Sequence, residues 1–425
     1  MEFRHYVLDN GLNLYVLPTT KFKTVMLKAF WHQNLDQDAA KNALLAMILK
    51  RGTRQHPTSR GINLHLEELY GAEFDSRVIK KGERQIIEFE LELVKDSLVN
   101  EPLLEKGLEL LREILLDPLV NDEGFDPEYL AQEKEQLGQL IASVYNDKVQ
   151  YSAERCLEEL GKNERFGISR YGKVNDFPGI NTENLYQHYL ARRNTVPVDV
   201  FVVGDVNPEQ VYSSVNKVLT FPRQGGYQLL PVEVEVPVSA TQEIIEKQEV
   251  NQGKLCLAYR TNLNYAADDY PALVVCNGIL GGFAHSKLFQ NVREKESLAY
   301  YATSRLEKSK GILLIASGIE FANYHRAREI IEAQVADLVK GNITDLELEN
   351  TKRALHHTLR AGTDNFHLMI DLALDGLING RLRKQSDFAR EIDRVTKADL
   401  LRVAEKIRLD TVYYLTNLEG AGTNG

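Results

Sequence analysis

The sequence predicts an α+β protein in which one unit of mixed helices and strands occurs twice. The expected order of strands and helices in residues 1–222 is repeated in residues 241–425. Between the two halves, residues 223–240 lose all periodicity and contain Gly225-Gly226 and two prolines, a composition typical of a linker. We therefore expect two homologous domains, 1–222 and 241–425, joined by the linker 223–240.

The first half begins with strands and continues with helices. Residues 3–17 alternate around Asp9-Asn10-Gly11, which predicts a β-hairpin. Residues 25–31 are apolar enough for a central strand, and residues 42–51 predict an apolar helix that Gly52 is suited to end. The remaining elements expected here are helices over 59–70, 103–116, 126–143, 152–160, 182–192 and 208–218, and strands over 73–78, 85–93 and 199–206.

The second half repeats this order. An apolar helix over 270–280 is closed by Gly281-Gly282, as the first apolar helix is closed by Gly52. The turn Lys308-Ser309-Lys310-Gly311 matches the turn Lys80-Lys81-Gly82, and both lead into a strand. Residue identity between the halves is low, so the inferred duplication depends on the order of elements. The other elements expected here are strands over 254–260, 299–306, 312–316 and 410–415, and helices over 286–294, 324–339 and 345–360.

Composition and charge exclude several classes of protein. The net charge is −10, with acidic and basic residues interspersed, so nucleic acid is not an expected partner, because phosphate binding needs a basic face. No charged-then-apolar leader and no apolar run of ~20 residues is present, so we expect neither export nor a membrane partner. The isolated cysteines Cys156, Cys256 and Cys276 indicate reduced, buried thiols in a cytoplasmic protein.

Three stretches carry a resemblance to a known family. These are residues 9–18, residues 50–53 at the end of the first apolar helix, and residues 281–300. The last has a glycine-rich turn, a helix, and then Arg293 and Tyr300 seven positions apart. Together they resemble the insulinase, pitrilysin and mitochondrial processing peptidase family of zinc proteins, over essentially the whole chain. The resemblance implies two α/β-sandwich domains, each a mixed, mostly antiparallel sheet with helices on one face.

The resemblance also implies where a zinc site would lie. Active members bind zinc through an inverted His-x-x-Glu-His motif on the first-half helix and a glutamate on a later helix. The corresponding positions in this chain are Ala43, Ala46 and Met47 and, on the later helix, Leu140. None of these side chains can bind zinc through nitrogen or oxygen or move a proton. We therefore expect a degenerate metal site filled with core residues, no bound metal and no other cofactor.

Arg293 and Tyr300 are retained, and the resemblance implies that both contact the substrate peptide. Read without the flanking signature, they would be a surface arginine and a packed tyrosine at a helix-to-strand junction. Tyr301 is adjacent, and because a strand points neighbours to opposite faces, we expect only one tyrosine to face the substrate. The seven-residue spacing favours Tyr300.

These observations predict a catalytically inactive peptidase homologue with no catalytic residue of its own. It would pair with a zinc-bearing homologue as a heterodimer, or with itself as a homodimer, to bind and process a peptide or unfolded polypeptide. This is similar to short bacterial members of the family that lack the metal site and are encoded with a zinc-bearing partner. Two alternatives stay open: a non-enzymatic scaffold or interaction subunit of the same fold, and a metallopeptidase with relocated ligands.

Overall fold

The computed structural model describes residues 2–419, which form two compact units. Unit 1 contains the residues up to Ala142 together with Ile168–Pro231, and unit 2 contains Ser143–Gly167 together with the residues from Val232 onward. The units differ from the expected domains because Ser143–Gly167, expected in the first half, packs with the second. Residues 223–240 carry no helix or strand.

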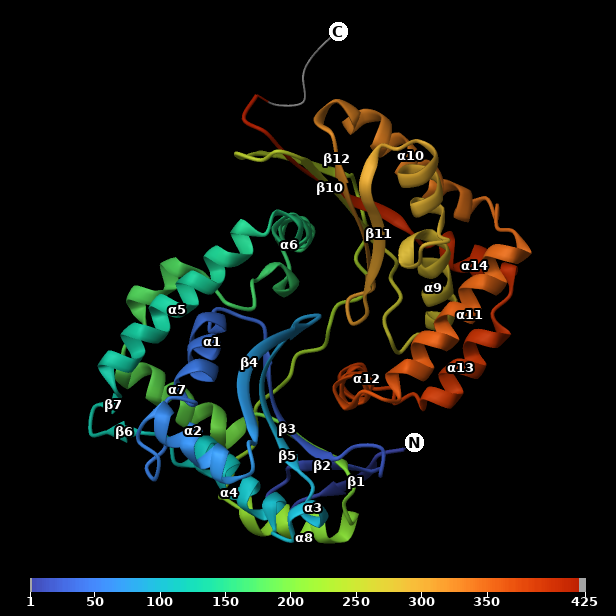
Figure 1. Cartoon of the computed structure of the whole chain (residues 1–425). Coiled ribbons are helices and arrows are strands. Elements are labelled where there is room, and N and C mark those ends of the chain that lie inside the picture. Colours follow the sequence, from blue (N-terminus) through green and yellow to red (C-terminus); the bar gives the residue numbers. More distant parts are fainter. Residues whose placement is uncertain (1, 420–425) are drawn as a thin grey trace. The chain divides into compact units, whose positions relative to one another are not determined.

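Unit 1 contains a six-stranded sheet in the order β1-β2-β8-β3-β5-β4 (Figure 1). Strands β2 and β8 are parallel, and the other neighbours are antiparallel. The expected mixed, mostly antiparallel sheet is therefore confirmed for this unit. The strands are β1 (Arg4–Val7), β2 (Asn13–Pro18), β3 (Thr24–Asn34), β4 (Glu73–Lys81), β5 (Arg84–Val94) and β8 (Val198–Gly204).

Helices cover one face of this sheet and share a single apolar core with it (Figure 1). Trp31, Phe89 and Val200 supply strand side chains to that core, and Leu44 and Leu111 supply helix side chains. A short two-stranded ribbon, β6 (Val120–Asn121) and β7 (Gly124–Phe125), lies outside the main sheet. The helices are α1 (Ala39–Ile48), α2 (Ser59–Glu68), α3 (Asp96–Val99), α4 (Leu103–Leu116), α5 (Pro127–Asn146), α7 (Thr182–Thr195) and α8 (Pro208–Val218).

Unit 2 contains a five-stranded sheet in the order β11-β12-β10-β13-β9. This is the order β4-β5-β3-β8-β2 of unit 1, and the single parallel pair, β13 with β9, again lies at the same place. The duplication expected from the sequence is confirmed by this equivalence of strand order and direction. The strands are β9 (Gln242–Lys247), β10 (Gly253–Arg260), β11 (Ala299–Glu307), β12 (Ile312–Ile319) and β13 (Arg408–Thr416).

Both faces of the unit 2 sheet are covered. One face packs with α9, α10 and α14 in a large apolar core (Figure 1). The opposite face packs with α6 in a smaller core, where Cys156 and Leu160 meet strand side chains such as Cys256 and Tyr413. The helices are α6 (Lys148–Leu160), α9 (Tyr270–Asn277), α10 (Tyr324–Val339), α11 (Asp345–Gly362), α12 (Phe366–Ile378), α13 (Gln385–Arg394) and α14 (Lys397–Ala404). Strand β9 and helices α12, α13 and α14 were not predicted from the sequence.

Three local turns need glycine, for two different reasons. Gly82 and Gly311 have φ of +58° and +67°, the left-handed conformation that suits glycine in equivalent turns of both units. Gly52 does not end α1, which stops at Ile48 with Leu49 as its C-cap. A Cβ on Gly52 would lie 2.9 Å from the carbonyl carbon of Pro57, so glycine is needed there for close backbone approach and not as a helix cap.

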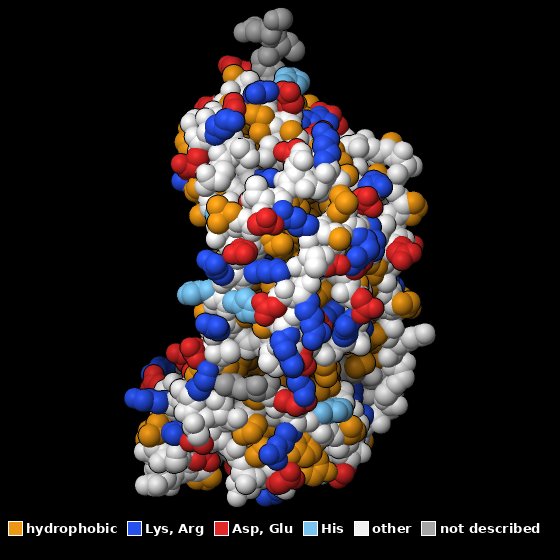
Figure 2. Space-filling view, turned by 90° about the vertical axis from the view of Figure 1, so that its right-hand side faces the viewer, with side chains coloured by type: hydrophobic (Ala, Val, Ile, Leu, Met, Phe, Trp, Pro, Cys, Tyr) orange, Lys and Arg blue, Asp and Glu red, His pale blue; other side chains and the backbone are white. Residues whose placement is uncertain are grey.

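The surface is mixed in character. On the face drawn in Figure 2, acidic and basic side chains are interspersed and do not form a basic patch of one sign. Within residues 2–419, no helix combines the length and the apolar character needed to cross a bilayer.

Candidate functional site

Helix α1 holds three of the four degenerate zinc positions. Ala43 and Ala46 are 2% and 1% exposed in the core of unit 1, and Met47 packs against the same core from a partly buried position. Leu140 is different: it lies on α5 and is 39% exposed. The expectation that all four positions are filled with core is therefore wrong for Leu140. Because none of the four carries a nitrogen or oxygen donor, these residues do not fit a zinc ion.

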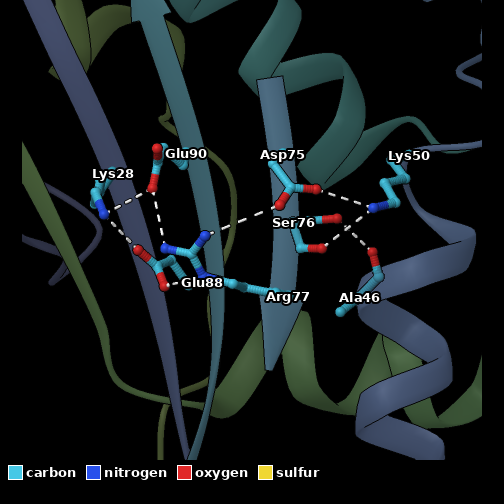
Figure 3. Close-up of polar contacts among 8 residues, drawn as sticks. All are labelled: Lys28, Ala46, Lys50, Asp75, Ser76, Arg77, Glu88 and Glu90. Atoms are coloured by element: carbon cyan, nitrogen blue, oxygen red, sulfur yellow. Dashed lines mark hydrogen bonds and ion pairs between the residues drawn. The ribbon is translucent and has the colours of Figure 1, made fainter. Parts of the chain in front are cut away.

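Strand β4 is fastened to the end of α1 by polar contacts (Figure 3). The Ser76 hydroxyl donates to the carbonyl oxygen of Ala46. The Lys50 ammonium lies 3.0 Å from a carboxylate oxygen of Asp75, so Lys50 pairs with the strand. The backbone that would present a metal motif is thus held in place, although its side chains are not ligands.

A partly buried ion pair joins the turn after α1 to α5, close to these positions. The Arg51 guanidinium donates to Glu133, which is 2% exposed, and to Gln132 Oε1 at 2.8 Å, and it lies over the ring of Tyr129. This pair was not predicted from the sequence. The adjacent basic residues Lys50 and Arg51 are its one local signal, because the partners of Arg51 lie on a separate helix.

A second polar network lies behind the first turn of α1. Buried Asn42 donates to Gln85 Oε1 at 2.7 Å, and its carbonyl oxygen lies 2.7 Å from His188 Nε2. Burial lowers the pKa of His188 to about 4, so its imidazole is neutral near pH 7. These residues come from three separate segments, and no local sequence pattern connects them.

Within residues 2–419, no group of three or more His, Cys, Asp or Glu side chains is arranged to hold a metal ion. The histidines that the structure places in other contacts include His65, 3.3 Å from Glu68, and His285, 3.1 Å from the Thr351 hydroxyl. The described part of the chain therefore offers no cluster for relocated zinc ligands.

Arg293 lies at the end of a π-helical turn, Phe289–Lys295, in unit 2. A second π-helical segment, Gly278–Gly282, follows α9. Each of the two helices predicted in this region, 270–280 and 286–294, therefore contains a π-helical segment. The Arg293 side chain is 45% exposed, and its guanidinium lies over the Phe289 ring at 4.6 Å. Its nearest carboxylate, Glu294, is 3.7 Å away, which leaves the donors of Arg293 accessible.

Tyr300 lies on β11, the edge strand of the unit 2 sheet, and is 64% exposed. Its hydroxyl donates to Glu320 Oε1 at 2.7 Å, and this hydrogen bond raises the pKa of the phenol above its ordinary value. The phenol is therefore protonated and can donate a hydrogen bond at neutral pH.

A β-bulge changes the expected relation between Tyr300 and Tyr301. Ala299 pairs with Ile319 and Tyr301 pairs with Gly318, so Tyr300 is the extra residue. Ala299 and Ala302 both lie in the helix-side core although they are three positions apart, with two residues between them. The two tyrosines between them are therefore both directed away from that core. The expectation that only one could face the same side was wrong because the bulge interrupts the alternation.

Known proteins resemble this chain in sequence. Residues 180–355 match the family described as Peptidase M16 inactive domain. A Bacillus subtilis protein described as "Probable inactive metalloprotease YmfF" is 38% identical over 414 residues, which cover 97% of each chain. The same organism's "Uncharacterized zinc protease YmxG" is 34% identical over 128 residues, 30% of this chain and 31% of that protein.

A solved structure has the same fold over almost the whole chain. The crystal structure of a conserved protein from Enterococcus faecalis V583 has a TM-score of 0.90 at 29% identity, over 98% of this chain and 99% of that chain. These matches agree with the four positions that lack zinc donors. The chain therefore belongs to the M16 peptidase family, as an inactive homologue that lacks the family's zinc motif.

Proposed function

We propose that this chain is the non-catalytic subunit of a heterodimeric metallopeptidase whose zinc is held by a homologous subunit. The single observation that carries this proposal is the contrast between two sites. The α1 positions have no nitrogen or oxygen donor and lie in or against the core, whereas Arg293 and Tyr300 are exposed and have accessible donors. A chain that had lost all contact with substrate would have no reason to keep a bulged, exposed tyrosine on a sheet edge.

Each of the two residues has a defined chemical task in this proposal. The Arg293 guanidinium would donate to a carbonyl oxygen of the bound peptide and fix its register. The Tyr300 phenol would exchange its bond to Glu320 for one to the oxygen that gains charge at the scissile carbonyl. The zinc of the partner would activate the attacking water, and no residue of this chain takes part in that step.

The comparisons supply support for a partner of this kind. Bacillus subtilis has both a relative described as a probable inactive metalloprotease and a relative described as a zinc protease. We place the complex of the present chain in the cytoplasm, because Cys156, Cys256 and Cys276 are all free and buried, which is typical of proteins from reducing compartments.

The test is reconstitution with the zinc-bearing homologue from the same genome. Peptide cleavage should require both chains, and zinc analysis of the separate chains should find the metal with the homologue. Tyr300→Phe should lower kcat on the order of 100-fold, the size expected for loss of an oxyanion donor, and Arg293→Ala should lower kcat/KM at least about tenfold.

Matched variants separate these roles from general damage. Tyr70 is 48% exposed and donates to Glu101 at 2.8 Å, so Tyr70→Phe removes an equivalent hydrogen bond on unit 1. Arg353, 75% exposed on α11, serves the same purpose for Arg293. If cleavage does not require this chain, or if Tyr300→Phe leaves the rate unchanged, the proposal is wrong and a scaffold role is favoured. Cleavage by the chain alone at its full rate, with zinc bound to it, would overturn the proposal and favour a metallopeptidase with relocated ligands.

A further inference from the structure

Next to the bulge, three residues of unit 2 form a row across the sheet. Tyr301 on β11 pairs with Gly318 on β12, and Gly318 also pairs with Lys254 on β10. Residues paired in this way project from the same face. Tyr301 and Lys254 therefore stand on one face with a glycine between them, on the side to which the bulge also directs Tyr300.

The glycine makes the contact between the outer two residues possible. A Cβ at Gly318 would lie 2.5 Å from Tyr301 Cε1 and 2.9 Å from Gln252 Oε1. The Tyr301 ring therefore lies flat over the backbone of β12, in space that any other residue would fill. Its centroid is 5.8 Å from the Lys254 ammonium, within reach of a cation–π interaction.

Lys254 is a buried cation with neutral neighbours. It is 8% exposed, and its ammonium donates to the side-chain oxygen of Gln252. The negative charge of Asp147 raises the pKa of Lys254 without a direct contact. The Asp147 carboxylate instead accepts hydrogen bonds from the backbone N–H groups of Val149 and Gln150, as the N-cap of α6. Burial lowers the pKa of the Lys254 ammonium, which reflects the cost of a charge without an opposite charge beside it.

The other buried lysines show what a purely structural lysine looks like in this chain. Lys28 lies 2.6 Å from Glu88 and 2.7 Å from Glu90. Lys310 lies 2.6 Å from Glu164. In the described residues 2–419, Lys254 has no such ion pair, although it is buried to a similar extent.

We propose that Lys254 and Tyr301 form a subsite for a carboxylate of the bound peptide, beside the position that Tyr300 contacts. This rests on the proposed function. The carboxylate would replace the neutral amide oxygen of Gln252, a partly exposed residue, and give the ammonium the opposite charge that it lacks. The ring of Tyr301 would hold the ammonium in place and pack against the peptide. The substrates are therefore peptides with an acidic residue, or with a free C-terminus, near the scissile bond.

The experiment presents the immobilised full-length chain with a synthetic random octapeptide library, acetylated at the N-terminus. One form of the library has a free C-terminal carboxylate and the other an amide. The bound fractions are sequenced by mass spectrometry for the wild type, Lys254→Met, Lys254→Arg and the control Lys247→Met, in which an exposed lysine of β9 is removed.

We expect Asp and Glu to be enriched over Asn and Gln about fivefold in the wild-type bound fraction. Lys254→Met should abolish this enrichment, whereas Lys254→Arg and Lys247→Met should keep it. Enrichment in the amidated library assigns the carboxylate to a side chain, and a requirement for the free carboxylate assigns it to the C-terminus. The absence of any bound fraction, or equal enrichment in Lys254→Met, overturns the subsite.

Cleavage of the same library by the reconstituted pair separates this inference from the proposed function. Cleavage that depends on Tyr300 but shows no acidic preference overturns the subsite alone. A Lys254-dependent preference in binding without any cleavage supports the subsite and overturns the proposed function. If Lys254 and Tyr301 merely fasten β11 to the sheet, Lys254→Met lowers the melting temperature and leaves peptide selection unchanged, which also overturns the subsite.

Discussion

Strands β4 and β11 are equivalent edge strands, and they use their polar side chains differently. In each unit a serine of the edge strand donates to a residue at the end of the first apolar helix. Ser76 donates to the main-chain carbonyl of Ala46, and Ser304 donates to Asn277, whose side-chain oxygen lies at 2.8 Å and main-chain carbonyl at 3.3 Å. Beyond that shared contact, the units diverge in how far their charged groups are paired.

On the unit 1 sheet, charged groups are joined into a network. Lys28 contacts Glu88 and Glu90, and Arg77 of β4 reaches the same two carboxylates at 3.0 and 3.2 Å (Figure 3). On the unit 2 sheet, the bulge leaves Tyr300 exposed, and Lys254 has only neutral contacts. The comparison shows that Lys28 of the unit 1 sheet is neutralised by carboxylates on its own sheet, whereas Lys254 of the unit 2 sheet has no carboxylate paired with it.

The largest effect should come from the buried ion cluster of unit 2. Arg260 is 3% exposed and bonds to Asp410 at 2.8 Å, to Glu164 at 2.5 Å and to the Leu160 carbonyl at 3.1 Å. We expect Arg260→Met to lower the free energy of unfolding by about 3–5 kcal/mol, because buried Asp410 loses its cation and Glu164 keeps only Lys310.

Urea unfolding can assign that loss to one unit. The single tryptophan, Trp31, is buried in unit 1, so its fluorescence reports on unit 1, whereas far-UV circular dichroism reports on both. Arg260→Met should shift the dichroism transition more than the fluorescence transition. Equal shifts would show that the two units unfold as one cooperative unit, so their stabilities could not be compared separately.

The next effect is a loss of unit 1 stability in acid. The pKa of His188 is about 4 in the folded protein and about 6.5 in the unfolded chain. The unfolded state therefore binds the proton first, and the free energy of unfolding falls as the pH drops from 6.5 towards 4, by on the order of 2–3 kcal/mol.

Trp31 fluorescence in urea at a series of pH values measures this dependence. His188→Gln keeps a hydrogen-bonding side chain at that position but does not titrate, so its unfolding midpoint should change less between pH 6.5 and 4. An unchanged pH slope in that variant would show that other groups of unit 1 cause the acid sensitivity.

The two serine contacts test the equivalence of the units directly. Ser76→Ala and Ser304→Ala should each cost about 1 kcal/mol, the usual net value of one partly buried hydrogen bond. The control Ser213→Ala removes an exposed hydroxyl that bonds within α8 and should change stability by less than about 0.5 kcal/mol. Unequal costs for Ser76 and Ser304 would show that only one of the two contacts still fastens its edge strand.

The smallest effect should come from the exposed pair at the end of α1. Lys50 and Asp75 are 39% and 52% exposed, so Lys50→Met should cost no more than about 0.5 kcal/mol, since exposed ion pairs are screened by water and salt. Thermal melts at low salt and at 1 M salt check this, because any difference from the wild type should vanish at high salt. A cost of several kcal/mol would mean that β4 depends on this pair for its position.

The sequence predicted the elements whose signal is local. The helix over 103–116 and the turns at Gly82 and Gly311 follow from periodicity and glycine chemistry, and the structure confirms them. The duplication was also predictable, because the same order of predicted strands and helices occurs in both halves of the sequence.

Features that depend on contacts between distant segments were not predictable. The bulge at Tyr300 arises from pairing with β12 and changes the direction of Tyr301. The partners of Asn42 and Arg51 lie on other segments, and Leu140 was judged without knowledge of which face of α5 it occupies. For the same reason Lys254 was overlooked: its isolation from carboxylates is a property of the folded sheet.

Helix α6 has a consequence for how the protein can be made or divided. It is encoded among the elements of unit 1, yet it completes the smaller core of unit 2 against residues such as Ala258, Leu314 and Leu415. A protein cut within 223–240 would therefore give a C-terminal fragment with an uncovered apolar face, prone to aggregate unless the other fragment is co-expressed. During synthesis on the ribosome, α6 emerges before any strand that it covers. Its apolar face can be fully buried only after β13, the last strand, has been synthesised.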